Sequence, residues 1–260
     1  MSDAFFSIDG DGFVPQVHAT GPWSPDYLHG GPPCALATRA LERSFPDDFQ
    51  LTRLTFELLR PVGFSKLTLR TQVDAEGANV RRGTTVLEAD GKPLIRAQAM
   101  AFRRVPVALE LPGEPPPPLP ATLAPSALPF FPTPVGYHTA MELRYARGEL
   151  GRSPVAAWLR MKVPLLAGEK PSPFVRTVCA ADSGNGVAQV VDFKAFTFVN
   201  ADLTLTFLRR PKGEWICLEA HTLATKDGVG LTDTRLWDET GPVGRGTQSL
   251  VVRPRTVHAS

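Results

Sequence analysis

Residues 202–253 read DLTLTFLRRPKGEWICLEAHTLATKDGVGLTDTRLWDETGPVGRGTQSLVVR. Short turns rich in Gly, Pro and Asp divide this stretch into four segments, which predicts four antiparallel strands. The stretch repeats residues 52–103, because four residues recur at a spacing of 150: Pro61 and Pro211, Gly91 and Gly241, Gln98 and Gln248, Arg103 and Arg253. The chain therefore contains two copies of one unit, and only the later copy has an acid, Asp202, where the earlier one has Thr52.

The composition is that of an ordinary globular protein, with 43% hydrophobic residues and a formal net charge of +2. The basic residues are scattered, which argues against nucleic acid or a membrane surface as partner. The acidic N-terminus MSDAFFSIDGDG does not resemble a signal peptide. The three cysteines, Cys34, Cys179 and Cys217, lie among apolar residues without CxxC spacing, which predicts reduced packing residues in a cytoplasmic protein.

The first copy combines a helix with a meander of strands. Proline at positions 32 and 33 suits a first helical turn, and apolar residues then recur at helical spacing until Phe45-Pro46, which predicts a buried helix over 32–44. The apolar period then changes to two, which predicts strands at 51–60, 66–75, 79–89 and 94–103. Two shorter strands are expected before the helix, at 4–8 and 13–18.

Residues 106–134 contain 11 of the chain's 26 prolines, so this segment is predicted to run extended over the surface as a linker. It separates an N-terminal repeat, 1–105, from a C-terminal repeat, 135–260. In the second copy we expect strands within 137–148 and 154–163 and a helix over 173–190. Ser172 is the expected N-cap of that helix, and Gly184 and Gly186 predict a break near its end.

A helix that covers one face of an antiparallel sheet is a two-layer α+β unit with open sheet edges. Two such units can pair edge to edge, so that one continuous sheet carries both helices on its concave side. This arrangement would place the two helices and the facing strand residues around a shared crevice.

Several segments resemble the double-hotdog acyl-CoA thioesterases of the TesB-like (thioesterase II) class. In the first half these are HGG at 29–31 and LTFELLRPV at 54–62; in the second half they are MELRY, AAWLRMK, AADSGNG, ADLTLTFLRRP, GEW at 213–215 and GTQSLVVR. The resemblance covers most of the chain. It implies a tandem hotdog fold, two antiparallel sheets joined edge to edge with each repeat wrapped around a long central helix.

The resemblance also implies an active site in the C-terminal repeat, where an Asp, a Ser or Thr, and a Gln hold a water against the thioester. Asp202 and Gln248 occupy the Asp and Gln positions, and Thr222 is the hydroxyl residue, with Thr225 as the alternative. The chain departs from the family at His221, which replaces a glutamate, and at Leu203, which replaces a frequent histidine. Structural roles stay open as well: Asp202 could pair with a nearby arginine, and Gln98 occupies the place that matches Gln248.

Thioester hydrolysis needs an aligned water, a proton acceptor and donors for the carbonyl oxygen. We expect Asp202 to accept the proton, and we expect backbone N–H groups near Gly30 and Gly31 to bind the oxyanion at a helix start. Two further residues are secondary candidates. His29 precedes the helix, and Asp182, on the second helix, resembles a recurring family aspartate near the crevice.

The expected function is hydrolysis of an acyl-CoA to a free acid and CoA in fatty acid metabolism. A non-catalytic acyl-CoA binding protein is the alternative, motivated by His221 and Leu203, and an enoyl-CoA hydratase or dehydratase is a third. The sequence predicts no metal or cofactor, and we expect acyl-CoA and a second copy of the chain, in a homodimer, as partners.

Overall fold

The computed structural model describes residues 3–110 and 113–255. Residues 111–112 of the expected linker and residues 256–260 of the C-terminal repeat lie outside these ranges. The chain begins with a hairpin of β1 (Phe6–Asp9) and β2 (Gly12–Pro15), followed by a 3₁₀ turn at Val17–Ala19. The hairpin forms a separate two-stranded sheet.

The first repeat has the expected helix and four strands. Helix α1 (Gly31–Ser44) begins at the predicted pair of prolines and ends just before Phe45, and nine of its residues are buried. The strands are β3 (Phe49–Leu58), β4 (Thr68–Glu76), β5 (Val80–Ala89) and β6 (Lys92–Arg103). Apolar periodicity therefore predicted this helix and these four strands to within about two residues of each boundary, whereas the strand expected at 13–18 ends earlier, at Pro15.

The second repeat differs from its prediction at two places, besides a strand at Phe196–Asn200 that was not predicted. Tyr137 was expected in a strand, but residues Tyr137–Ala140 form a single helical turn, α2, before the strands β7 (Met141–Glu149) and β8 (Arg152–Met161). The predicted helix 173–190 is shorter: α3 (Pro173–Ala181) is followed by a separate turn, α4 (Gly184–Val187), where the glycines had predicted a break. Ser172 caps α3 as expected, because its hydroxyl accepts the Val175 N–H at 3.2 Å.

Five strands complete the second repeat: β9 (Phe196–Asn200), β10 (Asp202–Phe207), β11 (Trp215–Ala224), β12 (Val229–Asp238) and β13 (Gly241–Pro254). They belong to an 11-stranded sheet in the order β4-β5-β6-β3-β10-β13-β12-β11-β8-β7, with β9 paired to β13. The antiparallel pair β3–β10 joins the two repeats edge to edge. The fold is thus the α+β double hotdog.

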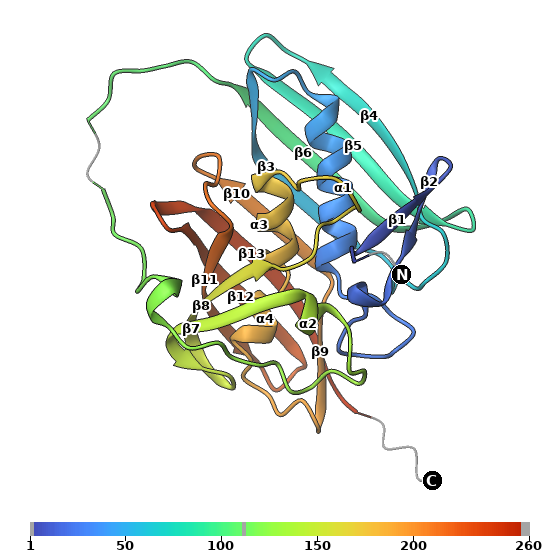
Figure 1. The fold of residues 1–260 in the computed structure, drawn as a ribbon, viewed down its shortest axis with the longest axis vertical. Coiled ribbons are helices and arrows are strands. Elements are labelled where there is room, and N and C mark those ends of the chain that lie inside the picture. The colour runs from blue at the N-terminus through green and yellow to red at the C-terminus, as the bar shows by residue number, and fades with distance from the viewer. Residues whose placement is uncertain (1–2, 111–112, 256–260) are drawn as a thin grey trace.

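Helices α1 and α3 lie side by side against the same face of the sheet (Figure 1). They run antiparallel, because the start of α1 contacts the end of α3 at Asp182, and the start of α3 contacts the end of α1 at Glu42. Leu54, Phe56 and other buried residues of the central strands pack beneath both helices in one continuous core. Each helix end therefore lies at a junction between the two repeats.

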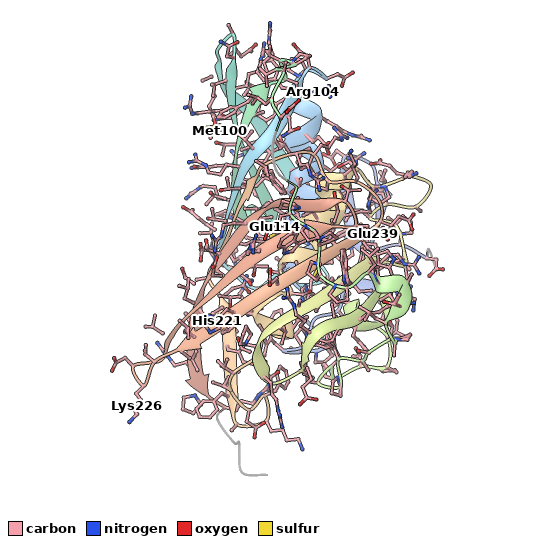
Figure 2. The ribbon with its side chains drawn as sticks, turned by 90° about the vertical axis from the view of Figure 1, so that its left-hand side faces the viewer. Met100, Arg104, Glu114, His221, Lys226 and Glu239 are labelled. Atoms are coloured by element: carbon pink, nitrogen blue, oxygen red, sulfur yellow. The ribbon has the colours of Figure 1, made fainter. Side chains whose placement is uncertain are left out.

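The segment before α2 crosses the opposite, outer face of the C-terminal strands, where Figure 2 shows Glu114. The Glu114 carboxylate accepts from Arg235 on β12 at 2.7 Å, and the Trp158 indole N–H donates to the Pro118 carbonyl at 2.8 Å. Beneath it lies a small separate core that includes Trp158, Trp215 and Trp237. This segment packs on the protein surface, as its proline content predicted.

The register of the sheet changes the alignment of the repeats by one residue. A bulge lies beside the pair Leu51–Ala101 in the first repeat and beside Asn200–Leu250 in the second, and the members of these pairs are 149 residues apart. A slip of one residue moves a strand side chain to the other face of a sheet. Gln98 is indeed exposed on the outer face while Gln248 is 1% exposed on the inner face.

At the spacing of 149, Gln248 and Asp202 correspond to other residues of the first repeat than at 150. Ala99 is the counterpart of Gln248, and Arg53 is that of Asp202. Gln98 therefore does not show that a structural glutamine belongs at the position of Gln248. Asp202 still lacks an acidic counterpart in the first repeat.

Candidate active site

The start of α1 and the end of α3 meet around a buried carboxylate. Asp182, 4% exposed, follows the last residue of α3. Its Oδ2 lies 3.1 Å from His29 Nδ1, and its Oδ1 accepts from Asn200 Nδ2 at 2.9 Å. Each carboxylate oxygen thus has one side-chain partner, which fixes the plane of the carboxylate while leaving lone pairs unused.

The two glycines of the HGG segment let the helices approach each other here. A Cβ on Gly30 would lie 2.9 Å from Oδ2 of Asp182, and one on Gly31 would lie 2.3 Å from the Cys179 carbonyl oxygen. A side chain on Gly30 would therefore displace the Asp182 carboxylate, and one on Gly31 would clash with the backbone of α3.

The same segment offers one free backbone donor. Residues 32 and 33 are prolines without N–H groups, and the Gly31 N–H points to His29 Nδ1 at 3.1 Å. Within residues 3–110 and 113–255, the Gly30 N–H has no acceptor. A free N–H at a helix start, where the helix dipole is positive, suits a developing negative charge on oxygen.

His29 is held as a neutral ring. Its imidazole stacks on Tyr137 with ring centroids 3.7 Å apart, and the Tyr137 hydroxyl bonds the Cys179 carbonyl and Ser183 Oγ, each at 2.8 Å. Burial lowers the pKa of His29, and the nearby Asp182 carboxylate opposes that shift only in part. Nδ1 is within reach of both Asp182 and the Gly31 N–H. In the tautomer with a proton on Nδ1, this nitrogen donates to Asp182; in the other tautomer, it accepts the Gly31 N–H.

Gln248 lies directly behind Asp182. Its Oε1 accepts the Asn185 N–H at 3.0 Å, and its Nε2 donates to the Asp182 carbonyl at 3.2 Å. Gly184 gives it space, because a Cβ there would lie 2.8 Å from Oε1 of Gln248. The glutamine therefore holds the turn between α3 and α4, and the same turn carries the carboxylate.

The other residues predicted for the site lie elsewhere. Thr222 is buried on β11 and bonds Thr232 on β12 at 2.8 Å, so one strand separates it from Gln248 on β13. Thr225 is exposed in the turn after β11. The Asp202 carboxylate accepts the Ser249 N–H at 2.7 Å on the outer face of the sheet, at the bulge between β9 and β10.

One cavity adjoins the carboxylate, and a second adjoins the first. The first, about 50 Å³, contains His29 and Asp182 in its wall. It is lined by aromatic rings in mutual contact, of which Trp23, Phe130, Phe131 and Phe193 are stacked and Phe198 is edge-on to Trp23 and Phe193. The second, about 330 Å³, is mostly apolar and is lined by residues that include Leu58, Val62 and Ile95. The cavities share four residues, Trp23, Leu28, Gly30 and Asn200.

The two cysteines near this site are buried. Burial is the main cause that raises the pKa values of Cys34 and Cys179, so both thiols stay protonated and act as packing residues. In the described part of the chain, no group of three or more His, Cys, Asp or Glu side chains could hold a metal ion. None of the helices in the same ranges is long and apolar enough to cross a bilayer.

Sequence reasoning missed Asn200 and Tyr137. Asn200 lies two residues before Asp202, the first residue of the stretch 202–253. It belongs to β9, which a bulge at Ala201 separates from β10. Tyr137 was assigned to a strand because YHTAMELRY contains β-favouring residues. No local pattern marks either residue, because both reach Asp182 or His29 through long-range contacts.

Solved structures confirm the fold over nearly the whole chain. The TesB protein of Mycobacterium avium subs paratuberculosis has a TM-score of 0.68 at 17% identity, with 96% of this chain and 96% of that chain covered. The acyl-CoA thioesterase II TesB2 of Mycobacterium marinum has a TM-score of 0.67 at 15% sequence identity, with 98% of this chain and 96% of that chain covered. A hot-dog-fold protein of unknown function from Alicyclobacillus acidocaldarius has a TM-score of 0.73 at 18% sequence identity, with 98% of this chain and 97% of that chain covered.

Family models extend the likeness to the sequence itself. No curated protein matches the sequence at a significant level. The model of the acyl-CoA thioesterase N-terminal domain, however, matches residues 19–102, and the model of the C-terminal domain matches residues 110–252. The two matches follow each other in the order of the two repeats and leave little of the chain unmatched. The chain therefore belongs to the acyl-CoA thioesterase family, as its resemblance to the TesB-like class had indicated.

Proposed function

We propose that this protein hydrolyses acyl-CoA thioesters at the junction of α1 and α3. The observation that carries the proposal is the buried Asp182 carboxylate, oriented by His29 and Asn200 in the wall of the small cavity, which shares Gly30 and Asn200 with the apolar cavity. A carboxylate next to a free helix-start N–H combines a proton acceptor with a donor for the carbonyl oxygen. Membership of the acyl-CoA thioesterase family supports the substrate class.

In the proposed reaction, the thioester carbonyl oxygen accepts the Gly30 N–H. Asp182 takes a proton from a water while the water oxygen attacks the carbonyl carbon. The carbon–sulfur bond then breaks, and Asp182 returns the proton to the departing CoA thiolate, which leaves a free carboxylic acid. Because burial keeps His29 neutral, its imidazole can orient Asp182 without forming a fixed ion pair that would weaken the base.

The sequence-based hypothesis gave the role of base to Asp202. Its carboxylate satisfies the Ser249 N–H at a bulge and points to the face of the sheet opposite Gln248. This geometry favours Asp182 as the base and a structural role for Asp202. Gln248 is better described as a positioning residue than as a ligand of water, because both ends of its amide are bonded to the turn after α3. We assign Thr222 no contact with the substrate, since its hydroxyl pairs with Thr232.

The apolar cavity beside Gly30 is the proposed acyl site. The pantetheine arm of CoA carries two amides, and burying an amide without a hydrogen-bond partner costs several kcal/mol, so a mostly apolar wall suits an acyl chain better. Its volume of about 330 Å³ is roughly twice that of an engineered cavity known to hold benzene. We therefore expect medium-length acyl chains to be the best substrates.

Paired variants test the proposal. We expect Asp182→Asn to lower kcat by about two orders of magnitude or more on a panel of acyl-CoAs of different chain length, assayed by release of free CoA. Asp202→Asn, the matched control, should keep kcat within a few-fold. Full activity of the Asp182 variant, or loss of activity only in the Asp202 variant, would refute the assignment. Circular dichroism of both variants checks that they fold.

One observation favours binding without turnover as a second candidate. The cavity at Asp182 has a volume of only about 50 Å³ beneath its aromatic cover, which leaves room for little more than a water or two. A protein that binds acyl-CoA in this way would bind a non-hydrolysable acyl-CoA analogue and release no CoA from any member of the panel.

A further inference from the structure

A second pocket lies at the other junction of the two helices. Glu42 follows Pro33 by nine residues, as Asp182 follows Pro173 by nine residues. Each acid lies at the end of its own helix and faces the start of the other helix, and the Ser172 hydroxyl donates to Glu42 at this second junction. The antiparallel helices thus repeat the arrangement of the first junction, with the roles of the two repeats exchanged.

The strands beneath the second pocket correspond as well. Phe49 and Leu51 line it, and they are the counterparts, at the spacing of 149, of Phe198 and Asn200 in the first pocket. The second pocket has a volume of about 390 Å³, which lies within the range of about 300–1,000 Å³ typical of small-molecule sites. It is therefore larger than the cavity at Asp182.

The residues proposed for hydrolysis are absent from this second pocket. Leu51 stands in place of Asn200, and Ala99 stands in place of Gln248. Counting back from Pro33 and Pro173, Lys170 and Pro171 replace Gly30 and Gly31, so two residues with side chains stand in place of the two glycines. Glu42 itself is bonded to Ser172 and paired with Arg210 at 3.4 Å. A ligand held here would not be hydrolysed.

The wall of the pocket combines an apolar floor with a basic rim. Phe45, Phe49, Leu51 and Phe174 are all less than 9% exposed and form the floor. The lining contains four basic side chains, Arg39, Arg43, Lys170 and Arg210, against three acidic ones, Glu42, Asp47 and Glu169. The pocket therefore carries a net positive charge.

Two of these basic groups are available to a ligand. Glu169 accepts two hydrogen bonds from Arg39, at 2.7 and 2.8 Å, so Arg39 already neutralises its carboxylate. Arg43 also lies 3.1 Å from this carboxylate, but as its second cationic partner. Arg43 is 60% exposed. Lys170 is exposed and forms no ion pair with any residue in the described ranges. Both can turn toward an anion at the mouth of the pocket without breaking a strong pair.

We propose that this second pocket is a binding site for a monocarboxylate with an apolar tail. The tail would lie on the phenylalanine floor, and the carboxylate would lie between Arg43 and Lys170 at the rim. The free acid released by a thioesterase belongs to this chemical class, but the proposal depends only on the lining of the pocket. It stands or falls independently of the chemistry at Asp182.

Calorimetric titration of the whole protein with octanoate tests the proposal. We expect a binding event that Leu51→Trp abolishes, because the larger side chain fills the floor, while kcat on acyl-CoA stays within two-fold. Since Leu51 is buried and its variant can unfold, Arg43→Glu and Lys170→Glu provide surface changes that should weaken octanoate at least ten-fold. The matched control is Lys226→Glu, on a lysine at the tip of the β11–β12 turn far from the pocket (Figure 2).

Octanol, which has the same tail without the charge, should bind at least ten-fold more weakly than octanoate. The proposal is overturned if the two rim variants bind octanoate as tightly as the Lys226 variant, or if octanol binds as tightly as octanoate. It is also overturned if the wild-type protein binds no octanoate that is sensitive to these changes. None of these results depends on whether the protein hydrolyses acyl-CoA.

Discussion

Replacing Gly30 with alanine tests the geometry of the proposed active site through a single methyl group. That methyl would lie 2.9 Å from Oδ2 and 3.1 Å from Oδ1 of Asp182, whereas ordinary contacts begin near 3.4 Å. The carboxylate must therefore retreat by about 0.5 Å, which strains its hydrogen bond of 2.9 Å to Asn200. A misplacement of 1 Å can cost ~10²-fold in rate, so we expect kcat to fall about ten-fold.

The fold itself should tolerate this change. Gly30 has φ −64° and ψ −24°, a helical conformation that alanine adopts readily. Gly→Ala at such a position stabilises a protein by about 0.4–1 kcal/mol through the unfolded state, which offsets part of the strain. The melting temperature should therefore change by no more than about 4 °C.

The assay is steady-state release of CoA together with thermal melting. Gly186→Ala is the matched control, because its added Cβ would meet nothing within 4 Å although the residue lines the same cavity. We expect that variant to keep kcat within two-fold. The reasoning is refuted if Gly30→Ala keeps full activity, or if both glycine variants lose activity equally.

Three further changes have defined outcomes. Gln248→Ala leaves the buried Asn185 N–H without its acceptor, so it should lower the free energy of unfolding in urea by about 1–3 kcal/mol. Gln98→Ala, on the exposed face, should change that free energy by no more than about 0.5 kcal/mol, and equal losses in the two variants would contradict the register. Asn200→Leu removes a hydrogen bond to Asp182 and should lower kcat about ten-fold with KM little changed; an unchanged kcat would remove the asparagine from the proposed mechanism. Because the pKa of His29 is lowered in the folded state, the unfolded chain binds the proton more readily, so folding stability present above about pH 6.5 should be lost as the pH falls below it. His29→Gln should flatten that decline in the pH dependence of urea unfolding, and an equally steep decline in the variant would show that another group causes it.

The fold could be predicted because it depends on local patterns. The period of two in 51–103 and the prolines at the starts of both helices reflect how each segment packs on the core. The strands of the first repeat and the starts of both helices could therefore be located closely. The helix break at Gly184 could be anticipated for the same reason. The turn at Tyr137 could not, because its helical conformation depends on the contacts of the ring with His29 and α3.

The site was less predictable because it depends on register. A spacing of 150 aligns the turns of the two repeats, whereas the bulges set the strands at 149, and this single residue decides which face a side chain occupies. Family resemblance indicated Asp202 by its position in the chain, and it could not show the side of the sheet to which the carboxylate points. Asp182 was already a candidate, but only its contacts with His29 and Asn200 give it a chemical role.

The pairing of β3 with β10 has a consequence for how this protein can change over time. In a symmetric homodimer, one codon specifies the same residue on both sides of the interface, so every substitution appears twice. Here the two sides are encoded separately in one chain, and a substitution in one pocket leaves the other untouched. Covalent linkage also makes the interface independent of protein concentration. The two junctions are thus free to specialise, and they already differ, because Leu51 stands where the other repeat has Asn200 and Ala99 stands where it has Gln248.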